Sequence, residues 1–290
     1  MRPARSVLYL PASNARAIEK ARSLACDAAI LDLEDAVAPE AKIEARAAAV
    51  AAVRAGGFGP RLGVRINALD TEWGADDLTA LADTAVDVVV VPKVEGAAAL
   101  SEVASRLTDS NALWAMIETP RALLALNDIA ASGGPLEALM LGTNDLVTML
   151  RTGPSPDREP LKPWLAQMVA TARAHGLLAI DGVFNRFTDT EGFAAECAQG
   201  RLYGFDGKSL IHPSQIEGAN AAFAPTEAEI AQARAIVAAF SAAEAAGCGA
   251  IQIDGQMVER LHLAAAKRIL EQHAATDRPS LSTKASHAPI

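Results

Sequence analysis

Short hydrophobic runs alternate with longer amphipathic stretches along most of the chain. Runs of this length between turn-forming residues are typical of buried strands, and Ala-, Leu- and charge-rich stretches are typical of helices. We predict strands at Val7–Leu10, Ala28–Leu33, Leu62–Ile66, Asp87–Val91, Leu113–Ile117, Glu137–Leu141, Leu177–Asp181 and Leu202–Phe205. Helices are predicted between them at Ser13–Ser23, Pro39–Arg54, Ala75–Thr84, Glu95–Thr108, Pro120–Ala131, Pro160–His175 and Asp189–Gln199.

Strict alternation of strands and helices predicts a parallel α/β fold. Eight strands close a TIM (β/α)8 barrel, for which about 250 residues is the usual size, and this chain has 290. The alternative, an open doubly wound sheet, normally carries a glycine-rich first turn. Here the first turn reads Pro11-Ala-Ser-Asn14, so the TIM barrel is the predicted fold class.

The chain continues past the predicted barrel. Two more helices are predicted at Pro225–Ala246 and Met257–His273. We therefore expect a barrel catalytic domain at 1–222, a helical extension or arm at 223–273, and a disordered Ser-, Pro- and Thr-containing tail at 274–290. Thr152–Pro163 has four prolines and no periodicity, which predicts a long surface loop or a lid.

Composition narrows the classes of protein that the chain can be. The net charge is −9 and no basic face is visible, which argues against nucleic-acid binding. No apolar run is long enough for a membrane span, and the apolar stretch after the basic Met1–Arg5 is too short for a signal peptide. Cys26, Cys197 and Cys248 fit no metal or disulfide spacing. We expect a cytoplasmic protein without nucleic-acid or membrane partners.

Two carboxylates end consecutive predicted strands. Glu118 closes Leu113–Ile117, and Asp145 follows Glu137–Leu141. A buried acid is costly unless something neutralises it, and a divalent metal is the simplest neutraliser. Two carboxylates with all-oxygen ligation suit Mg²⁺, which keeps waters and takes other ligands from substrate. An ion pair with a nearby Arg or Lys is the alternative that spacing leaves open.

Strand phase brings more polar groups to the same end. Side chains alternate along a strand, so Asp32 and Glu34 share the face of Ile30, which in a barrel is the interior face. By the same rule Glu118 shares a face with Met116, and we expect Leu141, Thr143 and Asp145 to be in phase. Barrel enzymes place their sites at the carboxyl ends of the strands.

Two cationic residues also end predicted strands. Arg65 offers a planar fork for a substrate carboxylate, and an internal salt bridge with Asp32 or Glu34 is the alternative. Lys93 either pairs with the acids or forms a Schiff base. A Schiff-base lysine needs a lowered pKa, whereas neighbouring acids raise it, so the ion pair is favoured.

Three later residues are weaker candidates on their own. A lone histidine such as His212 is more often a structural hydrogen-bonding group than a catalyst. Lys208 follows a glycine and would suit a phosphate. Asp254 lies between the two late helices, where the simplest interpretation is a helix N-cap.

Ten short segments in order resemble the citrate lyase β-subunit-like group of the HpcH/HpaI aldolase superfamily, which includes malyl-CoA and citramalyl-CoA lyases. Each is weak alone, but together they cover about residues 5–270. They are Arg5-Ser-Val-Leu-Tyr-Leu-Pro-Ala-Ser-Asn14 with Lys20-Ala21, Leu31-Asp-Leu-Glu-Asp-Ala-Val37, Val64-Arg-Ile-Asn67, Val91-Pro-Lys93, Ile117-Glu-Thr-Pro120, Leu141-Gly-Thr-Asn-Asp-Leu146, Ala179-Ile-Asp-Gly182, Gly204-Phe-Asp-Gly-Lys208, Ile211-His-Pro-Ser-Gln-Ile216 and Asp254-Gly-Gln-Met257.

The resemblance implies an enzyme with a TIM barrel, assembled as a homotrimer or a hexamer, that binds Mg²⁺, a 2-oxo acid and an acyl-CoA. By matching motif it makes Glu118 and Asp145 the metal ligands and Arg65 the carboxylate clamp. It makes Asp254 the acid/base, reaching into a neighbouring subunit's site. Lys208 and His212 would lie on the coenzyme A side, as would the Arg5–Lys20 region. Asp32, Glu34, Asp35 and Lys93 would surround the metal and substrate.

The implied reaction is reversible carbon–carbon cleavage of a 3-hydroxyacyl-CoA by a lyase. The alternatives are an aldolase on free hydroxy acids, a citrate lyase β subunit that needs acyl-carrier partners, and a CoA thioesterase. Asn144 departs from the family pattern, in which an acidic residue often precedes the metal-ligand Asp. Together with the Thr152–Pro163 loop, this leaves the acyl group and the oxo acid open.

Overall fold

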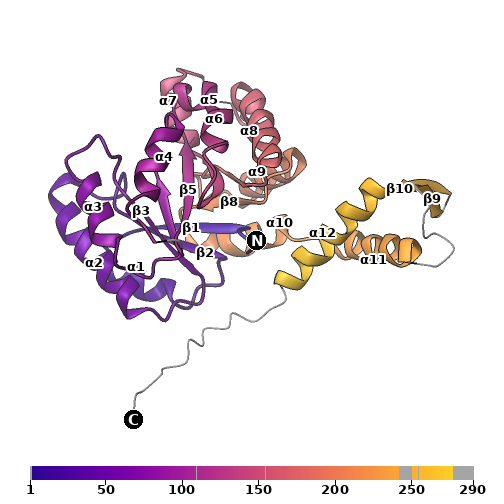
Figure 1. Cartoon of the computed structure of the whole chain (residues 1–290), viewed down its shortest axis with the longest axis horizontal. Helices are drawn as coiled ribbons and strands as arrows, with labels where there is room; N and C mark the ends of the chain where they lie inside the picture. Colours follow the sequence, from indigo (N-terminus) through magenta and orange to yellow (C-terminus); the bar gives the residue numbers. More distant parts are fainter. Residues whose placement is uncertain (1, 109, 154, 242–249, 254, 277–290) are drawn as a thin grey trace, which may run out of the picture. The chain divides into compact units, whose positions relative to one another are not determined.

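The computed structural model describes residues 2–108, 110–153, 155–241, 250–253 and 255–276 (Figure 1). They form two compact units. One is built from residues 4–223, and the other holds Arg2, Pro3 and the described residues from 224 onward. Within the described residues, every helix is too short or too polar to cross a membrane.

The larger unit is a closed barrel of eight parallel strands, which confirms the predicted fold class. Consecutive strands pair along the chain, and β1 closes the barrel by pairing with β8 at Ser6 and Lys208. The strands are β1 (Ser6–Pro11), β2 (Ala28–Asp32), β3 (Arg61–Arg65), β4 (Val88–Val91), β5 (Ala112–Ile117), β6 (Leu136–Leu141), β7 (Leu178–Asp181) and β8 (Gly207–Leu210).

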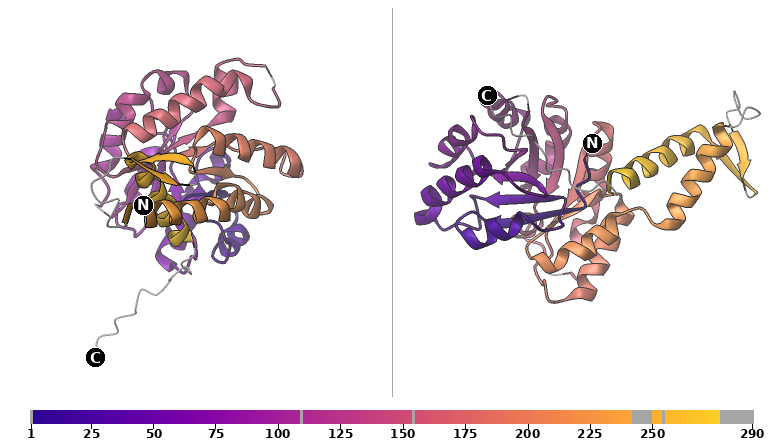
Figure 2. Two further views of the ribbon diagram at one scale, coloured as in Figure 1. Left: turned by 90° about the vertical axis from the view of Figure 1, so that its right-hand side faces the viewer. Right: turned by 90° about the horizontal axis from the view of Figure 1, so that it is seen from below.

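Helices surround these strands (Figures 1 and 2). They are α1 (Ala15–Ala21), α2 (Lys42–Ala55), α3 (Gly74–Leu81), α4 (Ala97–Ala104), α5 (Pro120–Leu124), α6 (Leu126–Ala130), α7 (Thr143–Met149), α8 (Lys162–Ala174), α9 (Thr190–Tyr203) and α10 (Ile216–Phe223). Short 3₁₀ turns occur at Pro39–Ala41, Glu159–Leu161 and Pro213–Gln215.

Alternating side chains of the strands form two separate apolar clusters. Leu31 and Leu33 belong to the larger cluster, which the helices cover, whereas Ile30 belongs to the smaller cluster that fills the barrel. Trp114 and Met116 lie in this interior cluster as well. The predicted phases of β2 and β5 are therefore confirmed, and both strands bring their last in-phase residues to the carboxyl end of the barrel.

The last barrel strand lies later than predicted. Helix α9 continues to Tyr203, where Gly204 ends it with a φ of 97°, so Leu202–Phe205 is not a strand. Strand β8 instead begins at Gly207, where a side chain would lie 1.8 Å from the carbonyl oxygen of Ala4. The sequence pattern did not predict this strand, because Lys208 is a charged residue in a fully buried position.

The smaller unit contains α11 (Glu227–Ser241), β9 (Ala250–Ile253), β10 (Gln256–Glu259) and α12 (Arg260–Thr276). Strands β9 and β10 pair antiparallel, which the sequence did not predict. Met257 lies in β10, so the predicted helix at Met257–His273 starts too early and also ends too early. Residues 274–276 belong to α12 rather than to a tail, and 277–290 lie outside the described residues.

Candidate active site

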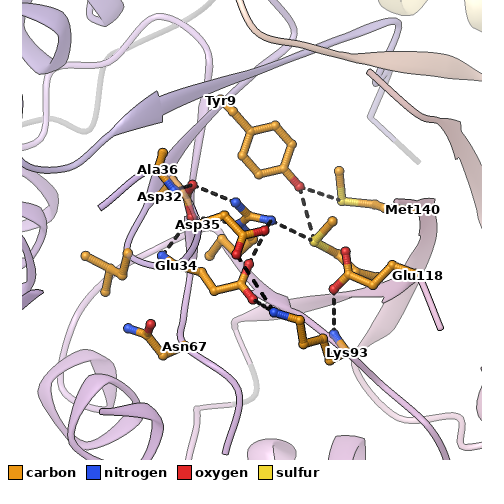
Figure 3. Close-up of polar contacts among 12 residues, drawn as sticks. Tyr9, Asp32, Glu34, Asp35, Ala36, Asn67, Lys93, Glu118 and Met140 are labelled. Carbon is orange, nitrogen blue, oxygen red and sulfur yellow. Dashed lines mark hydrogen bonds and ion pairs between the residues drawn. The ribbon is translucent and has the colours of Figure 1, made fainter. Parts of the chain in front are cut away.

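Charged side chains from consecutive βα units gather at the carboxyl end of the barrel (Figure 3). We call them the carboxyl-end cluster. Its members are Asp32, Glu34, Asp35, Arg65, Lys93, Glu118 and Asp145. Five carboxylates therefore face two cations in this group. The sequence predicted each of these residues for the site.

Arg65 is held by a two-point ion pair with Asp32. Its Nε donates to Asp32 Oδ1 over 2.7 Å and its Nη2 donates to Oδ2 over 2.6 Å. The two residues are register partners on β2 and β3, and both are buried. Asp32 also accepts the backbone N–H groups of Glu34 and Ala36 at 2.9 and 3.1 Å. Asp32 therefore orients both the guanidinium and the start of the β2 loop.

Glu34 lies between the two cations of the cluster. Its Oε1 accepts a 2.5 Å hydrogen bond from Lys93 Nζ. Its Oε2 lies 2.9 Å from Arg65 Nη1 but has no partner with hydrogen-bond geometry. Burial raises the pKa of Glu34, although both cations oppose this shift. Glu34 Oε2 is therefore a buried oxygen that can still accept a hydrogen bond.

Lys93 connects Glu34 to the next acid. Burial lowers the pKa of Lys93, but its hydrogen bond and charge interaction with Glu34 outweigh burial and raise it. A Schiff base needs the opposite shift. Lys93 also has a left-handed backbone, with φ 50°, and its N–H donates to Glu118 Oε1 over 2.7 Å. Figure 3 shows Lys93 between Glu34 and Glu118.

Glu118 is 2% exposed at the end of β5. Its pKa is raised to about 7, chiefly by burial and then by the charge of Glu34, with a further contribution from Asp145. Gly142 makes room for this carboxyl group. A Cβ at position 142 would lie 2.4 Å from Glu118 Cβ and 2.5 Å from Oε2.

Asp145 comes from a helix and not from a strand end. Leu141 belongs to the outer apolar cluster, and α7 begins at Thr143, so the predicted common phase of Leu141, Thr143 and Asp145 is wrong. The strand phase ends where the helix starts. Asp145 is half-buried in the first turn of α7. Its neighbour Asn144 is exposed and exchanges side-chain hydrogen bonds with Asn185, the shorter at 2.7 Å.

Tyr9 joins the site from β1, and the sequence reasoning missed it. Its ring packs with the interior cluster, and the Arg65 guanidinium lies 4.9 Å from the ring centroid. Its hydroxyl can donate its one hydrogen to Met116 Sδ at 3.6 Å or to Met140 Sδ at 3.8 Å. The signal was present in the strand phase, because Tyr9 alternates with the outward-facing Leu8 and Leu10.

Comparison with known proteins follows the same motifs. Residues 5–213 match the model of the family described as HpcH/HpaI aldolase/citrate lyase. The chain belongs to this family. It is therefore an enzyme of the HpcH/HpaI family, as the ordered segments predicted.

Individual relatives of the HpcH/HpaI family align over nearly the whole chain. A (3S)-malyl-CoA thioesterase of Cereibacter sphaeroides is 48% identical over 92% of this chain and 94% of its own. An L-malyl-CoA/beta-methylmalyl-CoA lyase of the same species is 36% identical, over 93% and 95%. The CitE protein of Mycobacterium tuberculosis, solved with magnesium, acetoacetate and coenzyme A, is 34% identical with a TM-score of 0.78, over 94% and 98%.

Lys208, which the family resemblance would place beside coenzyme A, is not presented to a ligand. It is fully buried, and its Nζ contacts Asp181 Oδ2 at 3.0 Å, Glu196 Oε1 at 2.7 Å and the Gly182 carbonyl at 2.6 Å. An ammonium group has three donors, so all are used. In this arrangement no donor of Lys208 is left for a phosphate.

His212 is exposed and caps the 3₁₀ turn at Pro213–Gln215, with Nδ1 2.8 Å from Ser214 Oγ. Its ring stacks on Phe187 at 4.6 Å between centroids. Arg5, at the other segment assigned to coenzyme A in the HpcH/HpaI family, pairs with Asp27 at 2.8 Å. Asp254, the predicted acid/base, lies outside the described residues, between β9 and β10.

Arg158 anchors the predicted long loop after β6, beside a hydrogen bond from Gln199 Nε2 to the Asp157 carbonyl at 2.7 Å. Arg158 has a left-handed backbone and is 8% exposed. Its Nη1 lies 2.7 Å from Asp181 Oδ1 and 3.6 Å from Glu196 Oε1, and its Nε donates to Gln199 Oε1. With Lys208 these side chains form a buried ion network between the barrel wall and α9. No sequence motif indicated it.

Proposed function

We propose that this protein is a magnesium-dependent enzyme that hydrolyses a 3-hydroxyacyl-CoA thioester of the malyl-CoA type. One observation supports the metal above all others. The carboxyl-end cluster has more carboxylates than cations, and burial together with the charge of Glu34 raises the pKa of Glu118 to about 7. A divalent cation would neutralise this surplus, and it would attract an anionic substrate that the acids alone would repel.

Glu118 and Asp145 are the residues proposed to hold the ion. The absence of a side chain at Gly142 leaves room beside the Glu118 carboxylate, and Asp145 is close enough to raise its pKa. Within the described part of the chain, no three His, Cys, Asp or Glu residues form a complete metal cage. Two carboxylates completed by waters and substrate oxygens are typical of Mg²⁺. The bound ion would supply Lewis-acid polarisation of a substrate oxygen.

Arg65 is proposed to receive the substrate carboxylate through one edge only. Its Nε and Nη2 are occupied by Asp32, so the two-point fork considered from the sequence is already used. Nη1 faces Glu34 Oε2, at an ion-pair distance without hydrogen-bond geometry, and the weak acceptor Met116 Sδ at 3.6 Å. A carboxylate oxygen would be a stronger acceptor than this sulfur.

Hydrolysis is favoured over carbon–carbon cleavage by the 48% identity with the (3S)-malyl-CoA thioesterase across 92% of the chain. In that reaction water adds to the thioester carbonyl, the carbon–sulfur bond breaks, and the proton lost by water balances the thiolate that leaves. The products are a hydroxy acid and free coenzyme A. Asp254, which the family resemblance makes the acid/base, is the proposed proton acceptor.

Carbon–carbon cleavage is the second candidate, because the 36% identical relative is a malyl-CoA lyase. The C3 hydroxyl would lose its proton, the bond between C2 and C3 would break, and C2 would gain a proton. Malyl-CoA would then yield glyoxylate and acetyl-CoA. The same carboxyl-end cluster would bind the substrate in both reactions, so the products decide between them.

The test is one incubation of purified protein with (3S)-malyl-CoA and Mg²⁺, in which the free thiol and glyoxylate are measured together. Thiol without glyoxylate supports hydrolysis, and glyoxylate with an equal amount of acetyl-CoA supports the lyase. If neither thiol nor glyoxylate is formed, both proposed reactions are refuted. Free malate in place of malyl-CoA tests the aldolase alternative, and activity of the single chain excludes a need for acyl-carrier subunits. EDTA should abolish the reaction and Mg²⁺ restore it.

A homotrimer or hexamer remains part of the proposal, because Asp254 is proposed to act in a neighbouring subunit's site. Light scattering after size-exclusion chromatography measures the state directly. Mixing inactive Asp254→Asn chains with inactive Glu118→Gln chains should restore activity if the two residues meet across subunits. Failure to restore activity in verified mixed oligomers would place both residues in one subunit's site.

A further inference from the structure

Two hydrogen-bond donors of the carboxyl-end cluster converge on one thioether sulfur. Arg65 Nη1 and Tyr9 Oη each lie 3.6 Å from Met116 Sδ. Thioether sulfur is a weak acceptor, whereas both donors can serve a carboxylate oxygen well. Met116 is 6% exposed and comes from β5, two residues before Glu118. The sulfur therefore occupies a position where an oxygen would be bound more strongly.

Tyr9 has no better partner among the described residues. Its hydroxyl has only the sulfurs of Met116 and Met140 as partners, at 3.6 and 3.8 Å. Figure 3 shows the hydroxyl directed toward Met140, on the side of the site where Glu118 lies. A hydroxyl that is partly removed from water normally finds an oxygen or nitrogen partner. Among the described residues, this hydroxyl has no oxygen or nitrogen partner.

The position of Tyr9 relative to Arg65 is also fixed. The guanidinium lies over the tyrosine ring, 4.9 Å from its centroid, while Asp32 holds the opposite donors of the guanidinium. Burial raises the pKa of Tyr9, so the hydroxyl keeps its proton at neutral pH. The two donors thus form a pre-oriented pair, one charged and one neutral.

We propose that Tyr9 is a substrate-binding residue, whose hydroxyl joins Arg65 Nη1 in binding one oxygen of the substrate's terminal carboxylate, which displaces the Met116 sulfur. The inference rests on the proposed function, because it takes the malyl group as ligand. Methionine suits the displaced position, since its side chain is flexible and its sulfur is held weakly. The pair would select acyl-CoA substrates that carry a carboxylate at C4.

The decisive variant is Tyr9→Phe, which removes one oxygen and keeps the ring over Arg65. Loss of a hydrogen bond to a charged group should raise the KM for malyl-CoA and the inhibition constant of malate about tenfold or more. The affinity for free coenzyme A, measured by calorimetry, should not change. The matched control is Tyr203→Phe, the same change at the other tyrosine of the chain, which lies on α9 in the outer layer.

A second variant separates ligand binding from support of the fold. Met116→Leu keeps the volume but removes the sulfur, so malate should bind as well as in the wild type or more tightly. If Met116→Leu weakens malate as much as Tyr9→Phe does, the hydroxyl serves the sulfur and the inference is overturned. Unchanged malate inhibition in Tyr9→Phe, in a protein that turns over malyl-CoA, overturns it as well. A wild type that neither binds malate nor turns over malyl-CoA refutes the proposed function itself.

Discussion

Lys208→Met is the sharpest test of the buried ion network, because it removes the charge and keeps most of the side chain. In the wild type the three donors of Lys208 contact Asp181, Glu196 and the Gly182 carbonyl. In the variant, Asp181 is still fully buried and keeps one cationic partner, Arg158, at 2.7 Å. The barrel wall would then contain more negative than positive charge.

The expected loss of stability is large. Removing one partner of a buried ion pair typically destabilises by about 3–5 kcal/mol, since the remaining charge is buried without compensation. With an m-value of about 3 kcal/mol/M, this lowers the urea midpoint of the barrel by about 1–1.7 M. The exposed Lys20→Met on α1 is the control, and surface changes of this kind stay within about 0.5 kcal/mol.

The pH dependence gives the same test an independent readout. Burial alone would raise the pKa of Asp181, but the charges of Lys208 and Arg158 outweigh it and hold the pKa below its usual value. A lowered carboxyl pKa contributes stability above the ordinary Asp value of about 4, and the contribution is lost as pH falls through the folded-state pKa. In Lys208→Met, protonation of Asp181 relieves the unpaired charge. The difference between variant and wild type should therefore shrink below about pH 4.

Two results would refute the structural role of Lys208. A urea midpoint shift no larger than that of Lys20→Met would mean that the network contributes nothing. A variant of wild-type stability with a raised KM for malyl-CoA and weaker coenzyme A binding would restore the phosphate role that the sequence predicted. Adding Asp181→Asn to Lys208→Met should recover part of the loss, because the unpaired carboxylate is then gone.

Three further predictions concern the carboxyl-end cluster. Gly142→Ala should weaken Mg²⁺ binding, measured by calorimetry, and lower the activity, each by more than about tenfold, because the new Cβ would lie 2.5 Å from Glu118 Oε2. The control is Gly153→Ala, where a Cβ would have no atom within 4 Å, and it should change neither the Mg²⁺ affinity nor the activity. Mg²⁺ affinity should rise from pH 6 to 8, because Glu118 with its pKa of about 7 must lose a proton to bind the ion; equal affinities at both values would contradict the assignment. Glu118→Gln should abolish Mg²⁺-dependent turnover and stabilise the metal-free protein above pH 7. The raised pKa of Glu118 means that folding favours the protonated acid, so the stability of the wild type falls as pH rises from about 4 through 7. A thermal midpoint of the variant below that of the wild type at pH 8 would contradict this.

A strand can be predicted from the sequence where it is a short apolar run buried on both faces. β4, Val88–Val91, is such a run, and both its interior and its outer residues are fully buried or nearly so. β8 could not be predicted in the same way, because Lys208 looks like a loop residue until its partners are known. Those partners come from positions 181, 182 and 196, and no local pattern reveals a contact across such separations.

The candidate site, like the strands, could be predicted from the sequence only in part. Glu118 and Arg65 were predictable because the strand phase alone brings both to the interior face at the carboxyl end. Which atoms of Arg65 stay available was not predictable, because Asp32 and Glu34 are both reachable and only the folded geometry assigns Asp32 the two-point contact. Asp145 was expected just after its strand and in phase with it, since glycine in Leu141-Gly-Thr-Asn-Asp145 does not by itself show where a helix starts.

Arg158 makes the loop after β6 a module with a fixed attachment point. Its arginine completes the charge balance of Asp181, Glu196 and Lys208 beneath the loop. Exchanging this loop between relatives, to alter substrate choice, would therefore succeed only when the donor loop carries an arginine at this position. A chimera without it would need Asp181 or Glu196 neutralised in the same step.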